Sequence, residues 1–150
     1  MGLRRRSREK TLQILYSLEF SKNLSIKDAV ETYFQYFNIS SKNETEHDEE
    51  EGVFIIYLLN QVHGNIAKIE SLIEDAALNW RIDRIALIER NILRMSVAEL
   101  IDEKNGVPFK ATINEAIDIA KKFGSKESSS FVNGIINKVA DIIDVKNKKL

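Results

Sequence analysis

The chain has 150 residues, of which 22 are basic, 23 are acidic and 43% are hydrophobic, and its formal net charge is −1. This balance excludes an intrinsically disordered chain and a uniformly basic nucleic-acid binder, and the length suits one domain with its own core. With no cysteine, one proline and six glycines, the chain has no disulfides or thiolate metal sites, and long helices are favoured over a turn-rich β fold.

Helical periodicity predicts six helices and no strand. In chain order they span about residues 5–20, 26–37, from an acidic block to about 76, 85–103, 112–123, and from Ser125 or Ser128 to near the C-terminus. The fourth is apolar on two sides, so we expect it to be central. The sequence therefore predicts an all-α, compact helical bundle of about six to seven helices, with a subdivision near Asn79.

Local signals set the expected helix ends. Ser25 with Asp28, and Thr112 with Glu115, have the spacing of capping boxes at the starts of the second and fifth helices. Gly124 is a natural end for the fifth helix.

Gly64 lies in the middle of the long third helix, where glycine costs about 1 kcal/mol relative to alanine. We expect the close approach of a neighbouring helix to explain it.

Charge is concentrated in a few places. The first helix begins with Arg4, Arg5, Arg6 and Arg8, an acidic block runs from Glu44 to Glu51, and the junction of the fifth and sixth helices carries Lys121, Lys122 and Lys126. A solvated surface explains the acidic block. Arginine binds phosphate in bidentate fashion and stacks on bases, so the arginines are candidates for nucleic-acid contact.

The sequence offers no convincing catalytic group. His47 lies in the acidic block and is interpreted as part of a surface loop, and His63 is interpreted as a partly buried histidine. There is no Gly-rich phosphate loop, and the longest apolar run, from Val53 to Leu59, is too short to span a bilayer. We expect a cytoplasmic protein that is not an enzyme and needs no cofactor or metal.

Several motifs resemble one known family. They are Arg4-Arg5-Arg6-Ser7-Arg8-Glu9, Leu12-Gln13-Ile14-Leu15-Tyr16, Asp83-Arg84-Ile85, Glu89-Arg90-Asn91-Ile92-Leu93-Arg94, Val107-Pro108, Ile113-Asn114-Glu115-Ala116, Ala120-Lys121-Lys122-Phe123-Gly124 and Phe131-Val132-Asn133-Gly134. In this order they are similar to the NusB family of bacterial transcription antitermination factors. Ser130 departs from the family, where a basic or histidine side chain is common.

The resemblance implies two packed three-helix subbundles, about 4–78 and 79–145, in a single NusB-like RNA-binding domain at 1–150. It implies binding of boxA RNA from ribosomal RNA transcripts together with the small-subunit ribosomal protein NusE, and indirect association with other Nus factors and RNA polymerase. Family members occur as monomers and as homodimers, so a homodimer of this chain stays open.

The resemblance also places residues on two surfaces. The RNA surface comprises Arg4, Arg5, Arg6, Arg8, Lys121, Lys122, Lys126, Glu127 and Phe131. The partner surface comprises Tyr16 and Glu89. Core packing is the alternative for Tyr16 and Phe131, and for Asn114 and Asn133 we expect structural hydrogen bonds between helices.

Two other functions are open at this stage. One is a helical protein–protein scaffold without specific RNA binding, in which the arginines only solvate the N-terminus. The other is an RNA-recognition domain of the kind fused to rRNA methyltransferases, against which the lack of a following α/β segment counts.

Overall fold

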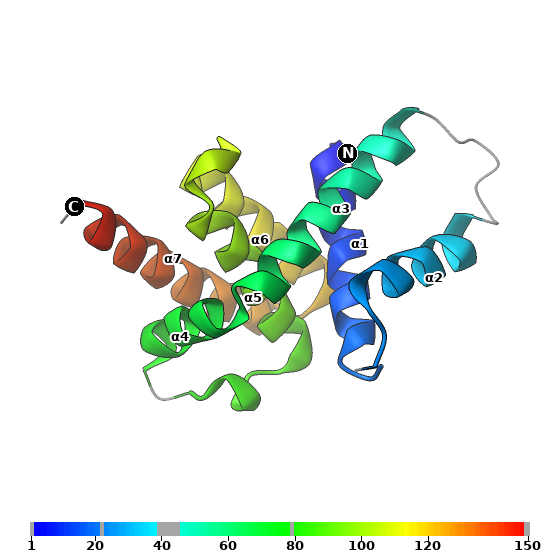
Figure 1. The fold of residues 1–150 in the computed structure, drawn as a ribbon. Coiled ribbons are helices and arrows are strands. Elements are labelled where there is room, and N and C mark those ends of the chain that lie inside the picture. The colour runs from blue at the N-terminus through cyan, green and yellow to red at the C-terminus, as the bar shows by residue number, and fades with distance from the viewer. Residues whose placement is uncertain (1, 22, 39–45, 79, 149–150) are drawn as a thin grey trace. The chain divides into compact units, whose positions relative to one another are not determined.

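The computed structural model describes residues 2–21, 23–38, 46–78 and 80–148. This part of the chain contains seven α-helices, two short 3-10 helices and no strand, which confirms the all-α prediction (Figure 1). The elements are α1 (Leu3–Leu18), α2 (Ile26–Asn38), α3 (Glu46–Gly64), α4 (Ile66–Ala77), η1 (Ile82–Arg84), α5 (Leu87–Ile101), η2 (Glu103–Asn105), α6 (Phe109–Phe123) and α7 (Lys126–Lys148).

The helices form two compact units, Met1–Asn60 and Gln61–Leu150. This division falls earlier than the expected subdivision into 4–78 and 79–145. The reason is that α4 packs against α5 and α7 and therefore belongs with the C-terminal helices.

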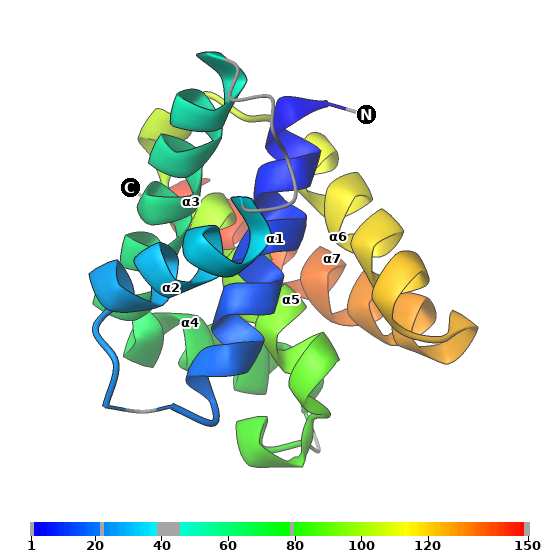
Figure 2. The ribbon, with the colours of Figure 1, turned by 90° about the vertical axis from the view of Figure 1, so that its right-hand side faces the viewer.

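In the first unit, α1 packs on α2, and the two helices lie side by side in Figure 2. The apolar face of α1 is buried through Leu12 and Ile14, and α2 contributes Ala29 and Val30. The expected cap of α2 is confirmed, because the Asp28 N–H donates to Ser25 Oγ at 3.1 Å.

A charged contact also ties α1 to α3 within this unit. Lys10 Nζ lies 2.5 Å from Glu51 Oε1, and the Glu51 side chain is 3% exposed. An ion pair with one partner so deeply buried adds little net stability, because the Glu51 carboxylate loses its hydration, but it holds the two helices in register.

In the second unit, α5 is the central helix, as its two apolar sides predicted. It packs against α4, α6 and α7, and α6 lies alongside α7 (Figure 2). Its buried residues are Asn91, Ile92, Leu93, Met95, Ser96, Val97, Ala98, Glu99 and Leu100.

The predicted long third helix is wrong, because the chain breaks at Asn65 into α3 and α4. The Asn65 side chain donates from Nδ2 to the Gln61 carbonyl at 2.9 Å, which satisfies a carbonyl group in the last turn of α3. Gly64 therefore ends a helix, and no atom outside its own helix would lie within 4 Å of an added Cβ, so the expected close approach is also wrong.

The start of α6 differs from the prediction as well. The helix begins at Phe109 after Pro108, whose φ of −61° suits the entry to a helix. Thr112 is buried within the helix, and its N–H donates to the Pro108 carbonyl at 3.3 Å, so it does not cap the helix. The expected end at Gly124 is confirmed.

One titratable group in the first unit is strongly perturbed. The Tyr33 hydroxyl of α2 donates to Gln13 Oε1 of α1 at 2.8 Å. Burial, followed by the negative charge of Glu51, raises the pKa of Tyr33 from 10.0 to about 12. Both effects disfavour the phenolate in the folded chain.

We therefore predict that folding stability falls as the pH rises from about 10 to about 12. In that window the unfolded chain releases the Tyr33 proton while the folded chain keeps it, so alkali favours unfolding. Urea unfolding on either side of pH 10 measures this effect. The Tyr33→Phe variant should show a shallower alkaline loss, and an identical loss in that variant would contradict the assignment.

Candidate nucleic-acid interface

The arginine cluster, Arg4, Arg5, Arg6 and Arg8, lies in the first two turns of α1. Arg4 and Arg6 are exposed and Arg5 is half-buried, whereas Arg8 is only 5% exposed. No acidic side chain lies in the first turn to offset the positive end of the helix dipole. The exposed part of the cluster is therefore a positively charged surface available to an anion.

Phe54 of α3 lies beneath this cluster. The guanidinium carbons of Arg4 and Arg8 lie 5.2 and 5.5 Å from the centre of its ring. Cation–π contacts of this kind are stronger when they are desolvated. Arg8, predicted to contact RNA, is thus packed inside the first unit. Arg4 contacts the same ring but remains at the surface of this unit.

The junction of α6 and α7 is tight. A Cβ on Gly124 would lie 2.7 Å from both Cβ and Oγ of Ser128, so only glycine fits there without a shift of Ser128. Ser125 Oγ accepts the Ser128 N–H at 3.2 Å and caps α7, which confirms one of the two expected caps.

Exposed charges surround this junction. Lys121, Lys122, Lys126 and Glu127 are all exposed. The Lys122 Nζ lies 5.6 Å from the centre of the Phe123 ring. The fold therefore gathers four of the predicted RNA-surface residues at one turn.

Phe131 is half-buried one turn further along α7 and contacts Trp80 edge to face, with ring centres 6.5 Å apart. Sequence reasoning did not select Trp80, which is 52% exposed. A large aromatic residue in a polar link beside Arg81 and Arg84 is the signal that could have found it.

The two predicted partner residues lie in different units. Tyr16 of the first unit is 39% exposed, and its ring lies 5.4 Å from that of Phe20, which is 69% exposed. Phe20, just beyond the end of α1, was also missed, although in the predicted helix 5–20 its position four residues after Tyr16 would place both rings on one face. Such an exposed aromatic pair suits a protein contact.

Glu89 lies in the first turn of α5 in the second unit, and its carboxylate accepts a hydrogen bond from Ser128 Oγ at 2.5 Å. This charge-assisted contact connects the predicted partner residue directly to the α6–α7 junction. Glu89 is half-buried.

We expected Asn114 and Asn133 to make structural hydrogen bonds between helices. The structure differs from this expectation. Both side chains are exposed and line an open groove of about 570 Å³ between α6 and α7. Asn133 accepts, through its carbonyl and side-chain oxygens, from Asn137 one turn along the same helix at 2.9 and 2.6 Å.

No metal site emerges among the residues that the structure describes, where three or more potential ligands nowhere gather. His63 is exposed rather than partly buried. The surface loop expected around His47 is wrong, because His47 lies in the first turn of α3, and Glu44 and Thr45 of the acidic block lie outside the described residues. Within the described ranges, none of the helices has the length and apolar character needed to cross a bilayer.

Comparison with known proteins identifies the family. The model of the NusB family matches residues 5–141. The transcription antitermination protein NusB of Myxococcus xanthus is 37% identical over 140 residues, which cover 93% of this chain and 96% of that protein. NusB of Anaeromyxobacter sp. strain Fw109-5 is 38% identical over 141 residues, covering 93% and 92%.

Solved structures agree. T. maritima NusB superposes with a TM-score of 0.78 at 28% identity, covering 94% of this chain and 92% of that one. A chain in the crystal structure of antitermination factors NusB and NusE in complex with dsRNA gives a TM-score of 0.78 at 25% identity, covering 95% and 98%. Because the family match spans residues 5–141 and the relatives align along 93% of the sequence, this chain belongs to the NusB family.

Proposed function

We propose that this chain is a transcription antitermination factor. It binds boxA-type single-stranded RNA of ribosomal RNA transcripts together with the ribosomal protein NusE, and the complex joins other Nus factors on RNA polymerase in the cytoplasm. The observation that carries the proposal is the match along nearly the whole chain to proteins named for transcription antitermination. A structural neighbour that contains NusB, NusE and dsRNA supports NusE and RNA as partners.

The surface chemistry of each unit supports RNA binding. Exposed Arg4 and Arg6 present guanidinium groups to phosphates from a packed helix. In the second unit, Lys121 and Lys126 flank a tight turn close to an aromatic pair. Single-stranded RNA is recognised by this combination of phosphate contacts and base stacking.

Residues of each unit, taken separately, support protein association. The exposed rings of Tyr16 and Phe20 offer apolar area, and Glu89 offers a negative charge that suits a basic ribosomal protein. Members of this family are binding factors and not enzymes, so the function consists of assembly and needs no chemical step.

RNA titration with and without the partner tests the function. BoxA RNA should bind more tightly than a scrambled strand, and saturating NusE should tighten binding by a coupling of about 1–3 kcal/mol. Equal affinity for both strands in both titrations would reject the proposal and favour the protein–protein scaffold.

The arginine cluster should contribute to the salt dependence of RNA binding. Replacing Arg4, Arg5 and Arg6 with alanine leaves up to three phosphates without a cationic partner, and should flatten the salt slope by about 0.7 for each such phosphate. The charge-matched control replaces exposed Lys27, Lys68 and Lys104. A slope that changes equally in both triple variants would contradict a local contact.

Arg8 should behave differently from its neighbours. Because it is buried against Phe54, Arg8→Ala should lower the free energy of unfolding by about 1–3 kcal/mol, whereas Arg6→Ala should leave it nearly unchanged. Chemical unfolding of the two single variants measures the contrast. Equal free energies of unfolding for the two variants would show that the contact between Arg8 and Phe54 does not stabilise the fold.

The charge of Glu89 should matter for the partner. Glu89→Lys adds like-charge repulsion and should weaken NusE binding more than binding of RNA alone. Ser128→Ala is the matched control, because it removes the hydrogen bond and keeps the charge. Calorimetry in which Ser128→Ala weakens NusE binding as much as Glu89→Lys does would assign the effect to the hydrogen bond instead.

A further inference from the structure

Trp80 is the only tryptophan of the chain and lies in the link between α4 and α5, 52% exposed to solvent. Its ring contacts Phe131 of α7 at 6.5 Å with an angle of 78° between the ring planes. An edge-to-face contact covers at most one face of one ring, so the exposed surface of Trp80 includes a flat aromatic area.

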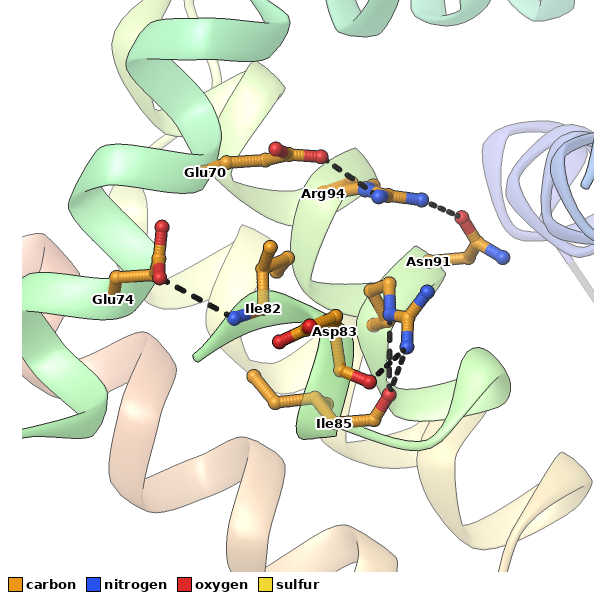
Figure 3. A network of polar contacts seen from close by, with 8 residues as sticks. Glu70, Glu74, Ile82, Asp83, Ile85, Asn91 and Arg94 are labelled. Atoms are coloured by element: carbon orange, nitrogen blue, oxygen red, sulfur yellow. Dashed lines mark hydrogen bonds and ion pairs between the residues drawn. The ribbon is translucent and has the colours of Figure 1, made fainter. Parts of the chain in front are cut away.

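The link that carries Trp80 is fastened to α5 and α4. Arg90 donates from Nε and Nη2 to the Ile85 carbonyl at 3.1 and 2.7 Å, and from Nη2 to the Asp83 carbonyl at 3.0 Å. The Ile82 N–H donates to Glu74 Oε2 at 3.4 Å (Figure 3). The chain that follows the tryptophan is thus held in one conformation, which lowers the entropy cost of binding at this ring.

The neighbouring charges favour a polyanion. Arg81 and Arg84 follow Trp80 and are both exposed, and one acid, Asp83, lies between them. Arg81 Nε lies 3.7 Å from Asp83 Oδ1, with side-chain exposures of 81% and 62%, so this ion pair is weak and leaves the arginine accessible.

We propose that Trp80 is a base-stacking residue for single-stranded RNA, which extends the RNA surface from Phe131 onto the α4–α5 link, with Arg81 and Arg84 next to the adjacent phosphates. The inference rests on the proposed function. Any base can stack on an indole ring. This position therefore contributes to the affinity for RNA and to the route of the strand across the surface more than to sequence preference.

The proposal can be tested directly on the wild-type chain, because Trp80 is the sole source of its tryptophan fluorescence. A boxA RNA oligonucleotide carrying a terminal label is titrated while label anisotropy and Trp80 emission are recorded together. Emission should be quenched along the same binding curve as the anisotropy. Anisotropy that rises while the emission stays unchanged would overturn the stacking role and leave the proposed function standing.

Variants provide the second measurement. Trp80→Leu should weaken RNA binding by about 5- to 150-fold, the range for loss of one stacked base, while Trp80→Phe should keep most of the affinity. Leu78→Ala is the control on the same link, since Leu78 is apolar and 75% exposed, and should bind RNA as the wild type does. Wild-type affinity for folded Trp80→Leu, checked by circular dichroism, would reject the proposal.

Two further outcomes separate the hypotheses. If NusE alone quenches Trp80 and RNA alone does not, the ring belongs to the protein interface and the proposal is wrong. If the wild type binds no RNA with or without NusE, the proposed function fails and the stacking role fails with it. A single abasic position in the RNA that weakens wild-type binding but not Trp80→Leu binding would identify the stacked base.

Discussion

The burial of α5 is the constraint on which the second unit depends. Nearly every residue from Asn91 to Leu100 is removed from water, including the polar Asn91 and Glu99. A helix buried over most of its length has to satisfy its buried polar groups internally. Arg94 therefore pairs with Glu70 of α4 at 2.7 Å and donates to Asn91 Oδ1 at 3.1 Å (Figure 3). These interactions hold α4 at a defined place beside α5, and α6 and α7 pack on the same helix.

The central helix positions the candidate functional residues of this unit. Glu89 reaches Ser128 from the first turn of α5, and Arg90 holds the link that precedes the helix. The α6–α7 turn is so narrow that only glycine fits at position 124 without a shift of Ser128. Surface charges and rings that are far apart in the sequence thus share one rigid support, which is how a small helical protein positions a binding surface without long loops.

The all-α class and most of the helices could be predicted from apolar periodicity, because burial repeats with the turn of the helix. The break at Asn65 could not, because the apolar pattern continues across it and only a local side-chain hydrogen bond marks the end of α3. The family resemblance selected the RNA-surface residues as a group. The burial of Arg8 was missed, because a charged side chain is expected to be exposed. Its actual environment depends on Phe54, which lies 46 residues later in the chain. Trp80 and Phe20 were missed for a related reason: exposure of an aromatic side chain depends on tertiary packing.

The ion pair between Lys10 and Glu51, with the arginines stacked over Phe54, means that the basic end of α1 is part of a packed helix pair. Many arginine-rich segments are disordered until RNA orders them, and that ordering lowers their affinity. A segment that is already anchored does not lose free energy to ordering when it binds RNA. Under the proposed function, its association with RNA is a docking of preformed surfaces, with a small change in heat capacity and a rate governed by electrostatic encounter rather than by folding of the segment.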